Sequence, residues 1–212
     1  MKKRFIIASI LLVISCSGKT GEGLYKGYEL PPYQIIKKSQ NIEIRQYQKS
    51  LVAEVEVEGE RKEAAKKGFW ILARYIFGKN TPNTKINMTS PVNQQEVSKS
   101  VSIAMTSPVN QQIQKNGKWI IQFGMPKNFT LQTLPKPEDK SIRFKTIKAR
   151  KMVAIVFSGR WNSEIFEQNK EKLSRFIKEN GLKTKGKEIL AYYDDPFTFP
   201  WNRRNEVIWE IE

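Results

Sequence analysis

The chain has 212 residues, no histidine and a single cysteine. The absence of histidine excludes a Ser-His-Asp or Cys-His catalytic arrangement, a histidine zinc site and an iron held by a proximal histidine. A single cysteine excludes a disulfide within the chain. Acidic residues are also scarce, 21 against 37 basic ones, and the net charge is +16. With 39% hydrophobic residues, the composition is that of a globular protein, long enough for one domain plus appendages.

Residues 1–15 predict a lipoprotein signal peptide. Three cations at residues 2–4 precede an apolar run over residues 5–14, which is about half the roughly 20 residues that a membrane-spanning helix needs. The sequence VISC at residues 13–16 resembles a bacterial lipobox, in which cleavage precedes the cysteine and lipid, such as palmitate, is attached to its thiol. The only cysteine of the chain is Cys16, so we expect it to be the lipidation site.

The predicted signal peptide places the protein in a bacterial cell envelope. Residues 16–27 are then the lipidated cysteine and a flexible tether, and residues 28–212 are the folded domain. Removal of residues 2–4 lowers the net charge from +16 to +13. Despite this charge we expect no nucleic-acid partner, because an exported protein meets lipid and envelope polymers instead. Ser17 stands where many inner-membrane lipoproteins have Asp, which favours the outer membrane, facing the periplasm or the cell surface.

Two strand-helix-strand-strand units are predicted in the folded domain. Alternating apolar residues predict a strand over residues 51–59, and a helix follows over residues 61–77. A second strand over residues 152–159 precedes a helix over residues 163–179. We therefore predict an α+β fold with a pseudo-two-fold repeat, a distorted antiparallel barrel of about eight strands flanked by two α-helices. The other strand candidates are residues 42–47, 86–91, 101–105, 119–125, 142–147, 190–196 and 206–211.

The helix over residues 61–77 is the most informative element. Beside its core stripe it carries a second apolar stripe, so that the apolar arc widens to roughly 260° at 100° per residue. Lys66 lies inside the added stripe and Arg74 at its edge. A large apolar patch rimmed by cations suits a flat hydrophobic molecule that bears carboxylates. The added stripe consists of Phe69, Trp70, Ala73 and Phe77.

An alternative reading is that the protein covers this helical face with its own chain. Two segments are candidates for the cover. One is residues 30–33, and the other is a hairpin predicted from the duplicated sequence MTSPVNQQ at residues 88–95 and 105–112.

The sequence gives only weak indications of metal binding, anion binding or catalysis. Asp194 and Asp195 invite a metal site, but their position before a proline predicts turn hydrogen bonds instead. The basic pair before Glu206 either presents a fork to an anion or holds the barrel shut through Glu206. No pair of residues stands out as catalytic, so we expect the protein not to be an enzyme.

Five motifs stand in order along the chain: KINMTSPV at 85–92, MP at 125–126, LPKPEDKSI at 134–142, ARKMVAIVFSGRW at 149–161 and AYYDDPFTFPWNRRNEVIWEIE at 191–212. Together they resemble the SOUL haem-binding proteins, over residues 28–212. The resemblance implies the fold described above and non-covalent binding of haem or a related tetrapyrrole, with no other cofactor. In that family the proposed pocket is an apolar shelf on the first helix, with basic residues for the propionates. It falls here on Lys66, Phe69 and Arg74, and a further pocket residue falls on Phe199.

Combining the resemblance with the helical wheel gives one candidate ligand-binding set. We expect Lys66 and Arg74 to pair with carboxylates and the aromatic residues to supply the stacking area. The set is Lys66, Phe69, Trp70, Arg74, Phe77 and Phe199.

The missing histidine removes the iron ligand proposed for some SOUL proteins. Tyr75 and Tyr192 could serve as tyrosinate, and Met88 or Met105 as thioether, although methionine more often fills a gap in the core. Packing and propionate contacts without any axial ligand are the remaining possibility. A different class of function also stays open, an effector-binding or protein-interaction module of the envelope without a haem function. The two-unit architecture resembles the effector domains of bacterial regulators.

Overall fold

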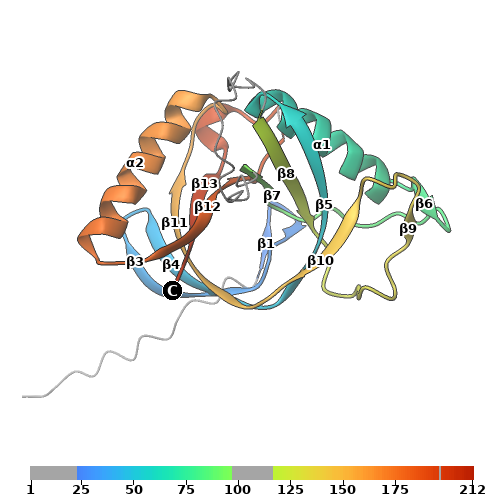
Figure 1. The fold of residues 1–212 in the computed structure, drawn as a ribbon, viewed down its shortest axis with the longest axis horizontal. Coiled ribbons are helices and arrows are strands. Elements are labelled where there is room, and N and C mark those ends of the chain that lie inside the picture. The colour runs from blue at the N-terminus through green and yellow to red at the C-terminus, as the bar shows by residue number, and fades with distance from the viewer. Residues whose placement is uncertain (1–22, 97–116, 196) are drawn as a thin grey trace, which may run out of the picture.

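A computed structural model describes residues 23–96, 117–195 and 197–212. Its main feature is a curled, antiparallel nine-stranded sheet that carries two helices on its outer side (Figure 1). The helices are α1 (Arg61–Ile76) and α2 (Ser163–Glu179). In sheet order the strands are β10 (Arg143–Ile147), β5 (Ser50–Gly59), β8 (Gly117–Gly124), β7 (Val92–Glu96), β12 (Thr184–Tyr192), β13 (Asn205–Ile211), β11 (Arg150–Phe157), β4 (Ile42–Tyr47) and β3 (Tyr33–Ser39).

Two small ribbons and a short helical turn complete the described part of the chain. β1 (Leu24–Tyr25) pairs with β2 (Tyr28–Glu29) at the start of the domain. β6 (Asn80–Thr81), which follows α1, pairs with β9 (Lys136–Pro137). The 3-10 turn Pro200–Asn202 precedes β13.

The α+β class and the antiparallel sheet with two helices are confirmed, but a closed eight-stranded barrel is not seen. A barrel closes only where its first and last strands pair. Here β10 and β3 are the edges of the sheet, and neither pairs with a further strand within the described ranges. Each helix follows one strand of the main sheet and precedes two others, β5-α1-β7-β8, with the two-residue β6 between α1 and β7, and β11-α2-β12-β13. This order of elements agrees with the pseudo-two-fold repeat, which stays a prediction.

Residues 86–91 were predicted as a strand, and that prediction is wrong, because β7 begins only at Val92. Pro91 has no amide proton to give to a ladder. The two side chains before it bond to neighbouring backbone, Thr89 Oγ1 to the carbonyl of Gly124 at 2.7 Å and Ser90 Oγ to that of Tyr193 at 3.2 Å. The predicted strand over residues 101–105, together with the second MTSPVNQQ copy and Met105, lies outside the described residues.

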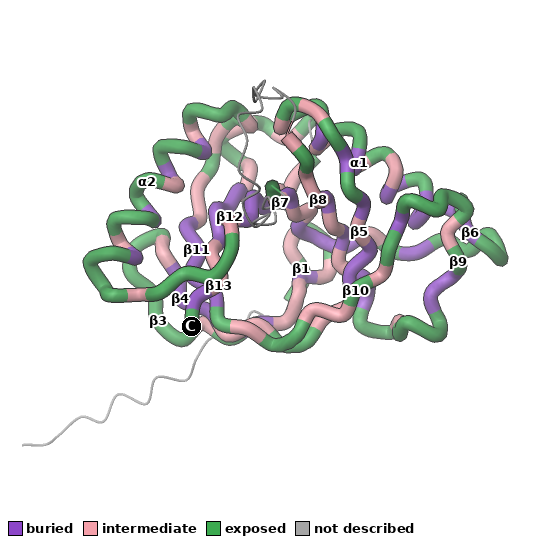
Figure 2. Tube along the Cα trace, in the orientation of Figure 1, coloured by how far each residue is buried: buried purple, intermediate pink, exposed green. Residues whose placement is uncertain are grey.

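Hydrophobic packing places each helix on its own half of the sheet. α1 packs on β5 and β8, and α2 packs on β11 and β13. Gly68 allows α1 to approach closely, since a Cβ built there would lie 2.3 Å from Ile121 Cγ1. Figure 2 shows buried residues on the strands and exposed ones along the outer surface of both helices. A third core cluster, which includes Met152, Ala191 and Ile208, fills the inner side of the second half.

Candidate functional site

The outer face of α1 carries two exposed aromatic side chains between two cations. Trp70 is 57% exposed and Phe77 is 63% exposed. They lie seven residues apart, two helical turns, and so share one face of the helix. Lys66 and Arg74, both exposed, stand four residues from Trp70 on either side along the chain. We call Lys66, Trp70, Arg74 and Phe77 the α1 shelf.

The cations of the α1 shelf are available to an anionic ligand. Among the described residues, neither Lys66 nor Arg74 has a carboxylate within ion-pair distance. The charge of Arg74 acts on one nearby acidic side chain, Asp139. Hydrogen bonds from Ser141 are the main reason why the pKa of Asp139 lies below its ordinary value, and the charge of Arg74 contributes to the same shift.

Phe69 supports the α1 shelf from the side of the core. Its half-buried ring packs edge-on against Phe123, with centroids 5.5 Å apart, and edge-on against Trp70, at 5.8 Å. Ala73, which the helical wheel assigned to the added stripe, is buried. The exposed apolar surface is therefore narrower than the arc predicted from the sequence. Within the described part, no segment of the chain covers Trp70 or Phe77. Of the two proposed covers, residues 30–33 are therefore excluded, whereas the predicted hairpin lies largely outside the described residues.

The structure places Phe199 in a different setting from the α1 shelf. Its ring, 62% exposed, stacks on that of Trp201 with centroids 4.9 Å apart and planes 7° apart. No ring contact joins it to α1 among the described residues. Phe199 therefore belongs to a separate aromatic surface on the loop between β12 and β13.

Neither candidate tyrosine offers its oxygen to an iron on the α1 shelf. Tyr75 is buried on the core side of α1 and donates a hydrogen bond to the carbonyl of Pro135 at 3.0 Å, and burial raises its pKa to about 12. The hydroxyl of Tyr192 donates to Gln94 Oε1 at 3.0 Å and accepts from Arg61 Nη1 at 2.8 Å. Burial raises the pKa of Tyr192 although the charge of Arg61 opposes the shift. Both tyrosines stay protonated at neutral pH.

The two methionines give no better iron ligand. Met88 is half buried and packs against the core beneath α1, which is the gap-filling position that methionine commonly takes. Met105 is outside the described residues. A tetrapyrrole on the α1 shelf would be held by stacking and ion pairs, and no axial ligand is apparent among the residues described.

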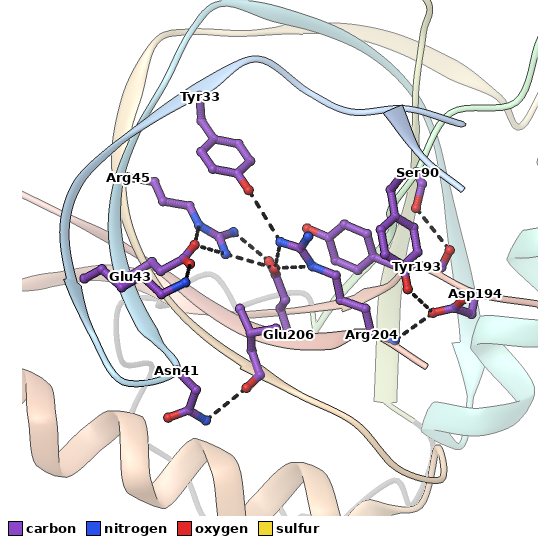
Figure 3. Close-up of polar contacts among 12 residues, drawn as sticks. Tyr33, Asn41, Glu43, Arg45, Ser90, Tyr193, Asp194, Arg204 and Glu206 are labelled. Atoms are coloured by element: carbon purple, nitrogen blue, oxygen red, sulfur yellow. Dashed lines mark hydrogen bonds and ion pairs between the residues drawn. The ribbon is translucent and has the colours of Figure 1, made fainter. Parts of the chain in front are cut away.

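A cluster of buried charges lies on the inner side of the sheet (Figure 3). Arg45 donates to both carboxylate oxygens of Glu206, at 2.7 and 2.9 Å, and its Nε donates to Glu43 at 2.9 Å. Arg204 donates to Glu206 as well, at 2.6 and 3.0 Å. The guanidinium of Arg45 also lies 4.6 Å from the centre of the Tyr33 ring. The charged groups of β4 and β13 satisfy one another's hydrogen bonds and charges. The cluster therefore serves to hold the fold together.

This cluster was only partly predictable from sequence. The expectation that Glu206 holds a barrel shut is met only in part, because its carboxylate binds Arg45 on β4 but the sheet is not closed. Glu43 and Arg45 were missed, because charged residues that alternate with Ile42 and Ile44 normally mark the solvent face of a strand. The only sequence signal was the alternation of apolar and charged residues along the strand. Such alternation separates the two faces of a strand but does not show which face the rest of the protein covers.

A cleft of about 670 Å³ lies on the inner side of the first half of the sheet. Asn93 and Gln122, paired across β7 and β8, line it and point away from α1, since side chains alternate along a strand. Asn93 Oδ1 is buried and has no hydrogen-bond partner within the structure. The volume lies within the range of small-molecule sites, about 300–1,000 Å³. Sequence reasoning missed this cleft because segments from opposite ends of the domain form it, including Leu30, Leu51 and Leu131.

Asp194 and Asp195, the acidic pair after β12, form hydrogen bonds that stabilise the neighbouring chain. Asp195 Oδ1 accepts hydrogen bonds from the amides of Phe197 and Thr198, at 2.7 and 2.9 Å, which confirms the predicted turn chemistry. Asp194 accepts from Tyr25, Lys26 and the amide of Arg204. Within the ranges described, no group of three or more acidic or cysteine side chains is arranged to hold a metal ion. Nor does any helix there have the length and apolarity needed to cross a membrane.

Solved structures share this curled sheet with two helices on one side. The chain is similar to the C-terminal domain of EcmrR, with a TM-score of 0.60 and 12% identity over 81% of this chain and 96% of that one. It is also similar to a structure described as a hydrolase from Listeria innocua, with a TM-score of 0.54 and 11% identity over 84% and 94% of the two chains. At these identities the likeness establishes the fold alone. No curated protein matches the sequence.

The curled antiparallel sheet with two helices on its outer side defines the class of the protein, an α+β domain. The family follows from the sequence, because residues 28–210 match the SOUL heme-binding protein family. The chain therefore belongs to the SOUL family, whose members are binding proteins for haem and related tetrapyrroles.

Proposed function

We propose that this protein is an envelope lipoprotein that binds haem or a related tetrapyrrole on the α1 shelf, without histidine ligation. The observation that carries the proposal is the exposure of Trp70 and Phe77 between two cations that lack a carboxylate partner in the described structure. The aromatic rings offer stacking area to a porphyrin. Lys66 and Arg74 offer charge-assisted hydrogen bonds to its two propionates.

The residues present fit the porphyrin and its carboxylates better than they fit an iron. Haem would supply redox-active iron when bound, whereas the side chains of this chain bind and orient the ring. Because the described part offers no free axial ligand at the α1 shelf, iron should contribute little to affinity. We therefore expect haemin and iron-free protoporphyrin to bind with dissociation constants within about tenfold of each other, or 1.4 kcal/mol.

A visible-absorbance titration of the mature chain with both compounds tests this proposal. Replacing Trp70 and Phe77 together by Ala should weaken binding of both by at least about tenfold, because each exposed ring contributes on the order of 1–2 kcal/mol on burial. Phe69 is left unchanged, since its ring packs on Phe123 in the core. The matched control is Leu131→Asp, which alters a 48% exposed side chain in the cleft and should leave binding unchanged.

A second candidate function is binding of a small organic molecule inside the cleft. The observation that favours it is the buried, unpartnered Asn93 Oδ1, because such an acceptor is costly unless a donor reaches it. The same titration separates the two candidates. If Leu131→Asp loses porphyrin binding while the Trp70 and Phe77 double variant keeps it, the binding site lies in the cleft. If neither porphyrin binds saturably to the wild-type chain, the tetrapyrrole proposal is contradicted.

A further inference from the structure

The loop between β12 and β13 exposes three large aromatic side chains within five residues. Phe197 is 94% exposed, and Phe199 and Trp201 are 62% and 69% exposed. We call these three residues the aromatic loop. Isolated exposed apolar residues are ordinary, whereas several together mark a surface that binds something. The α1 shelf does not account for the aromatic loop, because no ring contact joins the two surfaces in the described structure.

The aromatic loop is held in a fixed shape. Asp195 Oδ1 binds the amides of Phe197 and Thr198, as described above. Phe199 and Trp201 stack in parallel. The carbonyl of Pro200 accepts a hydrogen bond from the amide of Gly159 at 2.9 Å, which fastens the loop to the segment before α2. A preformed surface loses little conformational entropy when it binds.

The aromatic loop is also fastened to the start of the domain. Lys26 Nζ donates to Asp194 at one end of the loop and to the carbonyl of Asn202 at the other, at 3.0 Å for the second bond. Lys26 sits at the tip of the β1–β2 hairpin, where both Lys26 and Gly27 have positive φ values, 48° and 86°. The same hairpin therefore binds both ends of the loop and directly follows the segment that leads from Cys16.

The chain between Cys16 and the hairpin is short. Six residues lie between Cys16 and Gly23, where the described chain begins, so the two are joined by seven Cα-to-Cα steps. Fully extended, they span at most about 25 Å, and a flexible chain of this length spans about 15 Å on average. A lipid on Cys16 would hold the aromatic loop near the bilayer surface. Tethers of this length give effective concentrations on the order of millimolar, so even weak contacts would be populated.

We propose that the aromatic loop docks into the headgroup region of the bilayer that carries the lipid on Cys16. This inference rests on the lipid anchor in the proposed function and goes beyond it, because it assigns a membrane-binding surface to the folded domain. Phe and Trp side chains favour the boundary between headgroups and acyl chains. Arg160, exposed beside Gly159, and the net charge of +13 on the mature chain complement anionic headgroups.

Depth measurement by spin labelling tests the docking. The full lipidated chain is reconstituted in vesicles of phosphatidylethanolamine and phosphatidylglycerol, with Phe197→Cys carrying a nitroxide. The native thiol is occupied by lipid, so the introduced cysteine is the only free one. The matched control is Ile36→Cys on β3, a 54% exposed position. We expect the label at 197 to lie about 5–10 Å below the headgroup surface and the label at 36 to lie in water.

Each outcome bears on a different part of the proposal. A buried label at 197 that returns to water when Phe199 and Trp201 are replaced by Ser supports docking by the aromatic loop. A chain that carries its lipid and floats with the vesicles, but whose label at 197 stays in water, overturns the docking surface alone. A chain without lipid by mass spectrometry, which does not float, contradicts the lipoprotein proposal and removes the tether on which the docking depends.

Discussion

Among single residues, the buried charges on the inner side of the sheet have the largest energetic consequence. Arg45 and Glu206 are fully buried, and each has its partners within hydrogen-bond distance. Burial alone would raise the pKa of Glu206, but the charges and hydrogen bonds of Arg45 and Arg204 hold it below its ordinary value. The ionised carboxylate is therefore the form that the fold requires. Removing one partner leaves the others buried without compensation.

Glu206→Gln should lower the free energy of unfolding at neutral pH by about 3 kcal/mol or more. A folded pKa below the unfolded value of about 4.3 gives stability that is present above that value and lost as pH falls through the folded pKa. Urea unfolding between pH 7 and pH 3 should therefore show a shallower acid decline in the variant than in the wild type. Glu56→Gln, which removes an exposed pair with Lys118, is the control and should change stability by less than about 1 kcal/mol. Equal acid declines in Glu206→Gln and wild type would contradict this assignment.

Among the elements, the two helices differ in how they meet solvent. Asn162 caps the start of α2, since its side chain accepts a hydrogen bond from the amide of Ile165 at 3.2 Å. α2 buries one narrow stripe. α1 has no side-chain cap and leaves Trp70 and Phe77 in solvent on the face opposite its core stripe. Packing against β5 and β8, with Gly68 at the closest approach, is what holds α1 in place. The α1 shelf depends on that contact.

Gly68→Ala should destabilise the domain even though Ala is the better helix former by about 1 kcal/mol. The added methyl group would lie 2.3 Å from Ile121 Cγ1, and overpacking a core costs about 1–3 kcal/mol. We expect a lower urea midpoint with an unchanged slope. Lys67→Ala, at the exposed neighbouring position, should leave the midpoint unchanged. A midpoint for Gly68→Ala above that of the wild type would show that α1 can move away from β8 without penalty.

Across the whole molecule, the first described residues are bound to the last strands. The β1–β2 hairpin contacts Asp194 through Tyr25 and Lys26, and Tyr25 packs edge-on against Tyr193 with centroids 5.5 Å apart. The C-terminal strand β13 lies between β12 and β11, inside the sheet (Figure 1). The start and the end of the domain therefore stabilise each other. Asp194 joins them, because its buried carboxylate also accepts the amide of Arg204.

Asp194→Ala should loosen the start of the domain without unfolding it. Hydrogen exchange at residues 24–29 should become about tenfold faster or more, since losing a hydrogen bond to a charged group costs about 1.5–3 kcal/mol. Exchange in α1 and α2 should not change. The neighbouring variant Asp195→Ala removes only bonds within the aromatic loop and should leave residues 24–29 protected. Unchanged exchange at residues 24–29 in Asp194→Ala would contradict the role given to this carboxylate.

The sequence by itself determined the local structure and the family. The strand over residues 42–47 and the helix over residues 163–179 were predicted with their observed bounds, because period and capping are local signals. The five SOUL motifs and the widened apolar arc of α1 are likewise read from consecutive residues of the sequence. The lipid anchor, which is also a linear signal, stays a prediction.

Only the tertiary structure decided which faces are covered. It buried Ala73 and half of Phe69, placed Phe199 against Trp201, and left the sheet open between β10 and β3. It also turned Arg45 inward and formed the cleft beside Asn93. Periodicity divides a helix or strand into two faces, but pairing between distant segments decides which face meets the core, the solvent or a ligand.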